Sequence, residues 1–452
     1  MKRYDVIVIG GSAAGITAAM TARKHYPDKS LALIRKEQHV SIPCGIPYTF
    51  GIIGSPMKNL IPVDEMLANN RMDSLVDEVL EIDRAGHTVS TLSGEKYQYG
   101  KLIIATGSNP VIPPLPGRER KNIFAIKKDI PYIQEIIDKL VEAKDLCIVG
   151  CGFIGVEIAE ECRRRRPDMN ISIVEMLRHC LQLVYDKEFS LTAEKVLREQ
   201  NINLLLDERV EAFLGEGAVE KVVLNSGAEV KADMVIMGLG AEANSGLARA
   251  AGLEIGPTKG VQVNRYMQTS DSDIFACGDC AEKVSFFDGQ PSSLKLASIS
   301  TMEARMAGAN LFSLRRVNDG VIGVFSTILG GNVFAAAGLT LSQAEALGYS
   351  VIVGEAESIN RHPGTMPGGA NLKVRLLFEA GRYVLIGGQV TGATSGGELI
   401  NVISACINQR MTADDVVTFQ TGTHPALTAS PVAYQLVNAA ENAIGASRAT
   451  GV

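Results

Sequence analysis

Three features are scarce or missing in this sequence, and each absence excludes a class of protein. No run of about 18 apolar residues occurs, which is the length needed for a helix to span a membrane. Met1-Lys2-Arg3 leads at once into a strand pattern and lacks the architecture of a signal peptide. The net charge is −6, so no surplus of positive charge indicates nucleic acid as a partner. We therefore expect a cytoplasmic protein without a membrane span.

Cysteine is also sparse, because eight residues scattered over 452 do not make the dense pattern of a disulfide scaffold. In a cytoplasmic setting we expect these thiols to be mostly reduced. Cys277 and Cys280 are spaced like a metal or redox pair, but without a second pair they are interpreted as small packing residues, and no metal site is expected. The arginines at 163–166, followed by Pro167, are interpreted as the solvated end of a helix.

The chain contains two strand, glycine-turn, helix units, and its length indicates roughly two to four domains. An apolar strand at 4–9 runs into Gly-Gly-Ser-Ala-Ala-Gly at 10–15 and then into an alanine-rich helix pattern. A second strand at 146–149 runs into Gly-Cys-Gly-Phe-Ile-Gly at 150–155 and another helix. One such motif is weak, but two in matching contexts predict two dinucleotide-binding units.

The second unit carries all three glycines of the dinucleotide fingerprint. Gly150 makes the tight turn, Gly152 lets the backbone approach a pyrophosphate, and Gly155 allows close helix–strand packing. Glu175 ends the next strand and would accept hydrogen bonds from a ribose 2′-hydroxyl, which favours NADH over NADPH, although nearby Arg178 keeps NADPH open. The residues expected to hold NAD are Gly150, Gly152, Phe153, Ile154, Gly155, Glu175 and Gly240.

The first unit departs from the fingerprint, because Ser12 replaces the second glycine and the strand at 31–34 leads into Arg35 and Lys36 instead of an acid. We assign this unit FAD, since flavoenzymes often carry a late acidic turn, and Asp279 fits the role of accepting a hydrogen bond from the ribitol chain. The residues expected to hold FAD are Gly10, Gly11, Ser12, Ala13, Ala14, Gly15, Arg35, Lys36, Thr106, Gly107 and Asp279.

Cys44 is the candidate reactive thiol. Pro43 and Gly45 flank it, which fixes the backbone and leaves the sulfur little steric cover. If a helix begins just after Cys44, its N-terminus would lower the pKa of the thiol. No second cysteine lies four or five residues away, so an internal redox disulfide at Cys44 is not expected. The alternative is a buried, apolar cysteine.

These motifs together resemble the pyridine nucleotide-disulfide oxidoreductases, and most closely the single-cysteine branch of coenzyme A disulfide reductases, NADH oxidases and NADH peroxidases. The likeness includes Cys-Gly-Ile-Pro-Tyr at 44–48, Ala-Thr-Gly-Ser at 105–108 and the second glycine motif with Glu157. It implies an α/β fold with two Rossmann-like domains and a C-terminal α+β dimerisation domain, hence a homodimer with shared active sites. The expected boundaries are 1–112 and 241–317 for FAD, 113–240 for NAD, and 318–452 for dimerisation.

Two features distinguish between the members of this branch, namely residue 13 in the first glycine turn and the basic residues of the first helix. The resemblance implies a histidine in the first glycine turn of oxidases and peroxidases, where this sequence has Ala13, so it favours coenzyme A disulfide or polysulfide reductases. In those, basic residues of the first helix help to hold the CoA phosphates. Arg23, Lys24 and Tyr48 are therefore expected substrate contacts, although the two basic residues would fit equally well as solvated helix residues.

His424 precedes Pro425 at the place where two-cysteine reductases have a histidine that reaches across the dimer as acid or base. The alternative is a turn histidine that caps local backbone. The hypothesis is an oxidoreductase in which electrons pass from NADH through FAD to Cys44, which reduces a disulfide, persulfide or polysulfide while His424 protonates the leaving sulfur. The alternatives are an NADH oxidase or peroxidase working through a cysteine sulfenic acid, a flavoprotein that reduces a protein acceptor, and a non-enzymatic NADH-responsive redox sensor.

Overall fold

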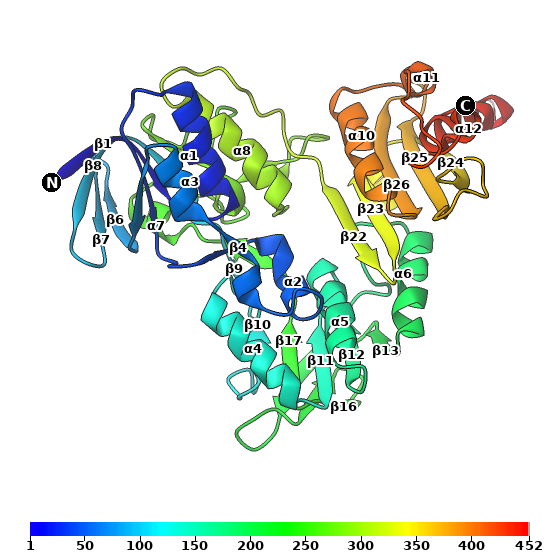
Figure 1. Cartoon of the computed structure of the whole chain (residues 1–452), viewed down its shortest axis with the longest axis horizontal. Helices are drawn as coiled ribbons and strands as arrows, with labels where there is room; N and C mark the ends of the chain where they lie inside the picture. The colour runs from blue at the N-terminus through cyan, green and yellow to red at the C-terminus, as the bar shows by residue number, and fades with distance from the viewer. Residues whose placement is uncertain (451–452) are drawn as a thin grey trace. The chain divides into compact units, whose positions relative to one another are not determined.

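The computed structural model describes residues 1–450, without the side chains of residues 449 and 450. The chain forms two compact units, whose elements are labelled in Figure 1. Unit 1 comprises Met1–Ala143, Arg164–Arg166 and Ile236–Val321, and unit 2 comprises Lys144–Arg163, Pro167–Val235 and the described residues from Ile322 onward. Each unit contains one of the two glycine turns.

The main sheet of unit 1 follows the order β5-β2-β1-β8-β7-β6, with β19 paired to β8. β1 is parallel to β2 and β8, and Val6 pairs with Leu31 on one side and Lys101 on the other. The parallel strands β5-β2-β1-β8-β19 thus show the 3-2-1-4-5 order of a dinucleotide-binding fold. The strands are β1 (Lys2–Ile9), β2 (Leu31–Arg35), β5 (Asp73–Val76), β6 (Val79–Asp83), β7 (Thr88–Thr91), β8 (Lys96–Ile104) and β19 (Ile274–Ala276).

Two helices rich in small residues, α1 (Ala13–His25) and α8 (Ala297–Asn310), lie side by side in unit 1 (Figure 1). A Cβ on Gly308 would lie 2.5 Å from the Ala18 carbonyl oxygen, so this close approach requires a residue without a side chain. Apart from the first residue of each helix, Ala13 and Ala297, the alanines are buried. This packing places the start of α1 and the start of α8 near the same edge of the sheet. The edge is the one formed by the carboxyl ends of the parallel strands, where such folds bind ligands.

The remaining elements of unit 1, apart from the 13-residue helix α4, are short. β3 pairs with β4, β9 with β18 and β20 with β21, all antiparallel. The elements are β3 (Val40–Ser41), η1 (Pro43–Gly45), α2 (Ile46–Thr49), η2 (Pro56–Lys58), β4 (Leu60–Ile61), α3 (Val63–Asn69), β9 (Ser108–Pro110), β10 (Ile123–Ala125), α4 (Ile130–Glu142), β18 (Ala241–Ala243), α7 (Gly246–Ala250), η3 (Gly278–Cys280), β20 (Lys283–Val284) and β21 (Pro291–Ser292).

Unit 2 contains the second strand, turn and helix. β11 is parallel to β12, and β12 to β13, in the order β17-β11-β12-β13. A small antiparallel sheet, β14-β15-β16, follows. The elements are β11 (Asp145–Val149), α5 (Phe153–Arg165), β12 (Asn170–Glu175), α6 (Lys187–Glu199), β13 (Ile202–Leu206), β14 (Val210–Leu214), β15 (Lys221–Leu224), β16 (Glu229–Lys231) and β17 (Met234–Met237).

The C-terminal part of unit 2 is an antiparallel sheet in the order β22-β23-β26-β25-β24, with helices packed against it. Its elements are β22 (Val324–Leu329), β23 (Asn332–Gly338), α9 (Leu341–Ala346), β24 (Val351–Ile359), β25 (Asn371–Glu379), β26 (Leu385–Gly392), α10 (Gly396–Asn408), α11 (Ala413–Thr418), η4 (Pro431–Ala433) and α12 (Gln435–Thr450). Two glycine-turn α/β units and a C-terminal α+β module are therefore present, which confirms the expected fold class. Across residues 1–450, none of the helices has the length and hydropathy needed to cross a membrane.

Candidate nucleotide sites and reactive cysteine

The first glycine turn is built so tightly that side chains are excluded at two positions. Gly10 has φ +115°, and a Cβ there would overlap the Ala105 carbonyl oxygen at the end of β8. A Cβ on Gly15 would overlap the Gly10 carbonyl oxygen where α1 passes over the turn. Ser12 occupies the N-cap position of α1, so its neighbours Ala13 and Ala14 begin the helix. The backbone N–H groups of that first helical turn form a positive end suited to a diphosphate.

Arg35 ends β2, where the sequence lacks the usual acid, and the structure brings it to the glycine turn. A Cβ on Gly11 would lie 2.5 Å from Arg35 Cδ, so glycine at that position makes room for the arginine stem. Both oxygens of Asp64 accept from Arg35 Nη2 at 2.9 Å, while Ser74 accepts from Nη1. Arg35 is 2% exposed, and Lys36 beside it is exposed. The Ser74 hydroxyl and the Arg35 guanidinium hold the pKa of Asp64 below its usual value.

The acidic turn lies against the first glycine turn. Gly278 has φ +77°, and a Cβ there would lie 2.7 Å from Ala14 Cβ. The Asp279 carboxylate accepts hydrogen bonds from Ser108 at 2.8 Å and Ser300 at 3.2 Å. Burial opposes ionisation of Asp279, but the nearby Lys128 ammonium and these hydroxyls outweigh it, so the pKa of Asp279 stays below its usual value. The turn therefore presents a carboxylate that is charged at neutral pH.

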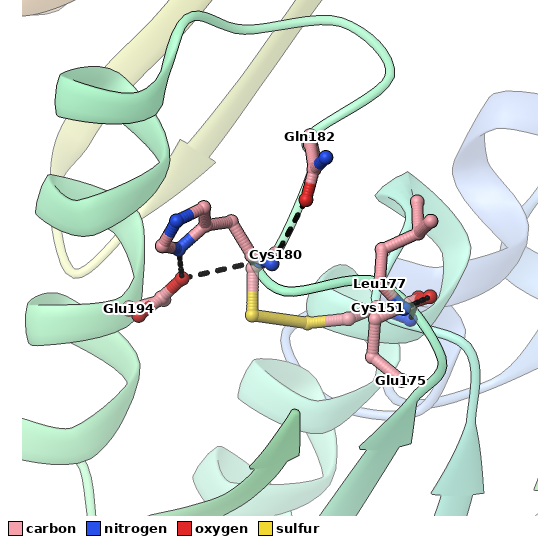
Figure 2. Close-up of a disulfide and its surroundings, with 7 residues drawn as sticks. Cys151, Glu175, Leu177, Cys180, Gln182 and Glu194 are labelled. Carbon is pink, nitrogen blue, oxygen red and sulfur yellow. Dashed lines mark hydrogen bonds and ion pairs between the residues drawn. A yellow bond between two sulfur atoms is a disulfide. The ribbon is translucent and has the colours of Figure 1, made fainter. Parts of the chain in front are cut away.

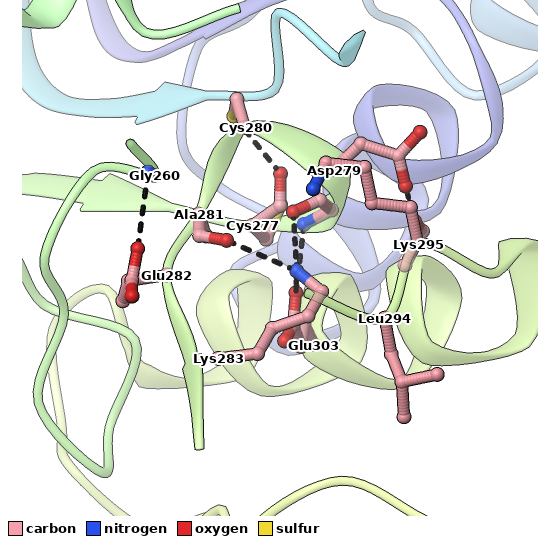
Figure 3. A network of polar contacts seen from close by, with 12 residues as sticks. Gly260, Cys277, Asp279, Cys280, Ala281, Glu282, Lys283, Leu294, Lys295 and Glu303 are labelled. Atoms are coloured by element: carbon pink, nitrogen blue, oxygen red, sulfur yellow. Dashed lines mark hydrogen bonds and ion pairs between the residues drawn. The ribbon is translucent and has the colours of Figure 1, made fainter. Parts of the chain in front are cut away.

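A buried ion pair supports this turn from below (Figure 3). Lys283 and Glu303 form a 3.1 Å ion pair with side chains only 2% and 1% exposed. Lys283 Nζ also donates to the carbonyl oxygens of Gly278 and Ala281, while Glu303 accepts from the Gly278 N–H at 2.9 Å. Burial raises the pKa of Glu303 to about 7. The sequence gives no sign of this pair, since a lysine and a glutamate 20 residues apart are an ordinary occurrence.

Thr106 and Gly107 sit directly after β8, next to the loop that returns from unit 2. Thr106 Oγ1 donates to the Asn244 carbonyl at 2.7 Å, and the Asn244 side chain donates back to the Thr106 carbonyl at 3.3 Å. Gly107 takes φ +73° and accepts from the Asn244 N–H. These bonds fix the two expected FAD residues at the carboxyl edge of the sheet.

Cys277 and Cys280 are completely buried beneath the acidic turn. Cys280 Sγ donates to the carbonyl oxygens of Ile104 and Cys277. Burial raises the pKa of both thiols, to well above the usual value for Cys277. The structure thus places both residues in the core as packing side chains, in line with their interpretation from the sequence.

Cys44 lies in η1, and the short helix α2 begins two residues after it. Its residue is exposed, which contradicts the alternative of a buried packing cysteine. Asn59 holds the segment: it donates to the Ile42 carbonyl at 2.9 Å, and its backbone carbonyl accepts from the Ile42 N–H. A Cβ on Gly45 would overlap the Asn59 side chain. Asn59 was not singled out from the sequence, because only the fold brings it beside the cysteine turn.

The four arginines at 163–166 lie at the end of α5, ahead of Pro167, as expected, but only Arg164 is exposed, so the interpretation as a solvated end is wrong for the other three. Arg165 donates to the carbonyl oxygens of Thr49, Phe50 and Gly54, which follow the Cys44 turn. Arg166 donates to the carbonyls of residues 140 and 141. Carbonyl groups at the ends of α2 and α4 have no intrahelical donors, so arginines satisfy them. Sequence pattern alone cannot reveal these carbonyl acceptors.

The second glycine turn repeats the geometry of the first. Gly150 has φ +103° and donates to the Val174 carbonyl at 2.8 Å, and a Cβ on Gly155 would overlap the Gly150 carbonyl oxygen. A Cβ on Gly152 would meet nothing within 4 Å, so the backbone there faces open space. Glu175 ends β12 as expected, and its two oxygens accept from the N–H groups of Cys151 at 2.7 Å and Leu177 at 2.9 Å. This leaves lone pairs on both oxygens for ribose hydroxyls.

Cys151 and Cys180 form a disulfide next to Glu175, with Cα atoms 5.1 Å apart (Figure 2). Six of the eight cysteines are thiols, in line with the expectation of mostly reduced thiols, and this pair is the exception. Glu194 of α6 anchors the Cys180 side, since its carboxylate lies 3.0 Å from His179 Nδ1 and accepts from the Cys180 N–H at 3.3 Å. The pairing bridges the glycine turn and the loop after β12.

The other expected NAD residues differ in placement. The Phe153 ring stacks on Phe325 of the C-terminal sheet, with centroids 5.3 Å apart. Ile154 is exposed, and Gly240, which belongs to unit 1, has φ +83° with open space where a Cβ would point. Glu157 lies four residues after Phe153 on α5. Its carboxylate accepts a hydrogen bond from Thr327 at 2.8 Å, and burial raises the pKa of Glu157 to about 7. Phe153 and Glu157 thus face the C-terminal part of the same unit.

The guanidinium of Arg23, an expected substrate contact, donates hydrogen bonds to backbone carbonyl groups. It donates to the carbonyl oxygens of Pro27, Lys29 and Arg71 at 2.8 Å. Lys24 beside it is exposed, and Tyr48 in α2 is half-buried one helical turn after Cys44. The geometry of Arg23 agrees with the alternative that it is a structural helix residue.

His424 lies in an exposed turn of unit 2. Its Nδ1 accepts from the Ala426 N–H at 3.2 Å, and its carbonyl accepts from the Thr428 N–H. His362 reaches the same turn, with Nδ1 3.1 Å from the Thr428 carbonyl oxygen. The local contacts match the alternative of a capping histidine, and they leave Nε2 as the ring nitrogen that a substrate would meet. Cys44 belongs to unit 1 and His424 to unit 2.

The residues present fit two dinucleotides. Each unit offers a helix N-terminus behind a glycine turn where added Cβ atoms would overlap backbone oxygens. In unit 1 the charged Asp279 stands beside that turn, and in unit 2 Glu175 stands at the end of the second strand with open space at Gly152. The donor set matches FAD in unit 1 and a nicotinamide nucleotide in unit 2.

Comparisons with known proteins identify the family. A family model described as pyridine nucleotide-disulphide oxidoreductase matches residues 4–304, and the dimerisation domain of the same family matches residues 324–433. The chain therefore belongs to the pyridine nucleotide-disulphide oxidoreductase family. It is an FAD-dependent oxidoreductase that uses a nicotinamide nucleotide.

Relatives within the family fall into two groups by name. An NADH oxidase of Methanocaldococcus jannaschii is 29% identical over 425 residues, which cover 92% of this chain and 93% of that protein. A CoA-dependent NAD(P)H sulfur oxidoreductase of Pyrococcus abyssi is 32% identical over 400 residues, which cover 86% and 88%. The solved structure of an NAD-dependent persulfide reductase from A. fulgidus has a TM-score of 0.90 at 28% identity and covers 99% of this chain and 84% of that one.

Proposed function

We propose that this chain is an NADH-dependent reductase of sulfur–sulfur bonds, with Cys44 as the thiol that attacks the substrate. One observation carries the proposal: Cys44 is an exposed cysteine on a turn that Asn59, Gly45 and α2 hold in a fixed conformation, within the unit that carries the FAD residues. The names of the sulfur oxidoreductase and persulfide reductase relatives support the same substrate class.

The proposed chemistry at Cys44 balances with a low-molecular-weight disulfide, RS–SR, as substrate. The Cys44 thiolate attacks one sulfur, forms a mixed disulfide Cys44–S–SR and releases RS⁻, which takes up a proton. Two electrons and a proton then return Cys44 to the thiolate and release a second RSH. FAD, when bound, supplies the path for those two electrons from NADH.

Each expected residue has a part in this proposal. The second glycine turn and Glu175 bind NADH, and the charge of Glu175 disfavours a 2′-phosphate. Gly10 to Gly15, Arg35, Lys36, Thr106, Gly107 and Asp279 hold FAD. Lys24 and Tyr48 are proposed substrate contacts, whereas Arg23 would have to release three carbonyl groups before it could bind a CoA phosphate.

The proposal includes a cytoplasmic homodimer, in which His424 of the partner subunit protonates the leaving thiolate. The family's dimerisation domain at residues 324–433 supports the dimer. A leaving thiol with a pKa of about 8.5 needs little acid help, so His424→Ala should lose activity only modestly, by less than about tenfold.

The test is NADH oxidation by FAD-loaded protein with coenzyme A disulfide, polysulfide, peroxide or air as the acceptor. We expect fast turnover with a sulfur acceptor, abolished in Cys44→Ser and retained in the control Cys406→Ala, which removes a buried cysteine of α10. Disulfide turnover that survives in Cys44→Ser would defeat the assignment.

The second candidate is an NADH oxidase or peroxidase, which the name of the 29% identical relative favours. Ala13 at the start of α1 counts against it, because the resemblance places a histidine there in oxidases. Turnover with oxygen or peroxide alone, and none with sulfur acceptors, would establish this second candidate.

A further inference from the structure

The Cys151–Cys180 disulfide has no part in the chemistry proposed at Cys44, yet it lies inside the second nucleotide-binding turn. It joins the fingerprint turn to the loop at residues 176–184 that follows β12. A backbone hydrogen bond of 3.0 Å, from the Leu181 N–H to the Cys151 carbonyl, lies beside it. The N–H of Cys151 also donates to Glu175, the residue proposed to bind the ribose. The pair is therefore coupled directly to the nucleotide contacts (Figure 2).

The residue after Cys180 has an unusual backbone conformation. Leu181 has φ +57°, in the left-handed region that bulky residues seldom adopt, and it is buried. Such a conformation persists only where its surroundings enforce it, and here the disulfide and the Leu181–Cys151 hydrogen bond do so. Strained backbone of this kind occurs often in ligand clamps and switch segments.

We propose that Cys151 and Cys180 form a reversible thiol–disulfide site that sets the affinity of the second glycine turn for its nicotinamide nucleotide. The inference rests on the proposed NADH-dependent disulfide reductase function. The exchange balances as Cys151–S–S–Cys180 + 2 RSH giving two cysteine thiols + RSSR, where RSH and RSSR are a low-molecular-weight thiol and its disulfide. Those are the proposed product and substrate of the enzyme, so no further reactant is needed.

Reduction should loosen the turn because the two sulfurs cannot stay where they are. Bonded sulfur atoms lie about 2.05 Å apart, whereas two non-bonded thiols need roughly 3.5 to 4 Å. Cys151 and Cys180 are 1% and 0% exposed, so the extra separation requires the loop after β12 to move. That movement would release Leu181 from its strained conformation and would disturb the N–H groups of Cys151 and Leu177 that orient Glu175.

The disulfide form is accordingly the preorganised form, with higher affinity for the nucleotide. The sulfurs are covered, but the loop above them is at the surface, since Met176 is 64% and Leu183 71% exposed. A limited opening of this loop would admit a small thiol. Accumulating thiol product would thus reduce the pair and weaken NADH binding, which gives the enzyme a feedback from product to cofactor affinity.

The experiment compares two states of FAD-loaded Cys44→Ser protein by titration calorimetry, with NAD⁺ standing in for NADH because NADH would reduce the flavin, and the constant it gives is taken as the NADH dissociation constant. One sample is oxidised with glutathione disulfide and one is reduced with dithiothreitol, and each reagent is removed before the titration. Alkylation and peptide mapping report whether residues 151 and 180 are linked. Using the Cys44→Ser background removes the reactive cysteine from the comparison and avoids turnover. We expect linked peptides only in the oxidised sample and an NADH dissociation constant about tenfold higher in the reduced one.

Two variants in the same background control the interpretation. Cys151→Ser/Cys180→Ser should bind NADH as weakly as the reduced protein and show no dependence on the redox treatment. Cys406→Ala should keep the full dependence. The central comparison needs no change at residues 151 or 180, so it holds even if the double variant folds poorly.

Equal dissociation constants in the linked and unlinked states would overturn the inference, as would a failure of the pair to open or close under these reagents. Absence of NADH binding in both states would instead overturn the nucleotide site itself. A wild-type protein that fails to reduce sulfur acceptors but shows the redox-dependent dissociation constant would defeat the proposed function and leave the switch established.

Discussion

The two glycine-turn units share a frame but differ at the end of their second strand. Arg23 and Arg163 each stand eight residues after the last glycine of their turn. Each donates to three backbone carbonyls at the matching places, Pro27, Lys29 and Arg71 in unit 1 and Pro167, Met169 and Asn201 in unit 2. The strand–turn–helix frame is thus repeated down to one arginine and its acceptors.

The second strands then end in opposite charges. β2 ends in Arg35, neutralised by Asp64, and its unit relies on the buried Lys283–Glu303 pair to hold the acidic turn. β12 ends in Glu175, whose carboxylate accepts from the turn itself, and its unit is closed by the Cys151–Cys180 disulfide. The two units therefore share a backbone frame, and a few side chains at the edge of that frame determine which nucleotide each unit binds.

The largest effect is expected from Lys283→Met, which removes one partner of the buried pair in unit 1. Glu303 would stay buried without its cation and the Gly278 carbonyl would lose a donor, so we expect a loss of about 3 to 5 kcal/mol in stability. Flavin content after purification and urea unfolding measure the result. The double variant Lys283→Met/Glu303→Leu should recover much of the stability, and a single variant with unchanged flavin content would show that the pair does not support the turn.

Glu157 is a further difference between the two units, because the equivalent position on the helix after the first glycine turn is Thr17. This difference can be tested by varying the pH. Burial, opposed by the Thr327 hydrogen bond, raises the pKa of Glu157 from its ordinary value of 4.5 to about 7. A raised carboxyl pKa contributes stability that is complete below pH 4.5 and is lost as the pH rises through 7. Relative to Glu157→Gln, the wild type should lose about 3 kcal/mol between pH 4.5 and 8.

Thermal unfolding of both proteins across that range measures the difference. Glu199→Gln, at an exposed position on α6, is the control and should follow the wild type. Parallel pH profiles for the wild type and Glu157→Gln would contradict the burial-driven shift.

The matched pair Arg23→Met and Arg163→Met tests whether the shared frame is structural in both units. Each change removes donors to three carbonyls that water can partly replace, so we expect about 1 to 2 kcal/mol of destabilisation in each. Arg23→Met should weaken FAD retention, and Arg163→Met should weaken NADH binding, both measured by titration. If Arg23→Met instead raised only the KM for coenzyme A disulfide, Arg23 would be a substrate contact and the equivalence would fail.

The smallest effect is expected from Glu175→Gln, which removes the charge, keeps one acceptor oxygen and replaces the other with an amide group that cannot accept from its N–H partner. The preference for NADH over NADPH should fall by about fivefold to tenfold, or about 1 kcal/mol, because a 2′-phosphate no longer meets a carboxylate. The ratio of the two dissociation constants is the measurement. An unchanged ratio would mean that Arg178 or another residue decides the choice.

Sequence patterns could predict whatever is encoded locally. The two glycine turns, Glu175 at the end of a strand, the Gly278–Asp279 turn and the helix after Cys44 all follow from short segments with a known geometry. The α+β character of the last third of the chain could be predicted for the same reason, because it follows from short local patterns.

The remaining features depend on contacts between distant segments. Asn59 reaches the Cys44 turn only because β4 pairs with β3, and Asp64 meets Arg35 only because β5 and α3 fold beside β2. Burial of Lys283 and Glu303 has no signature in either residue's neighbours along the chain. Cys180 lies 29 residues from Cys151, a separation that matches no motif and becomes meaningful only once the loop after β12 is placed.

The most direct test of the account is the covalent state of Cys44 after FAD-loaded protein meets coenzyme A disulfide without NADH. Mass spectrometry of the intact protein and its peptides would be followed by addition of NADH. We predict one CoA adduct, located on Cys44, that disappears when NADH is added and releases CoA thiol. A protein that forms no adduct at Cys44, yet oxidises NADH with coenzyme A disulfide, would contradict the role assigned to this cysteine.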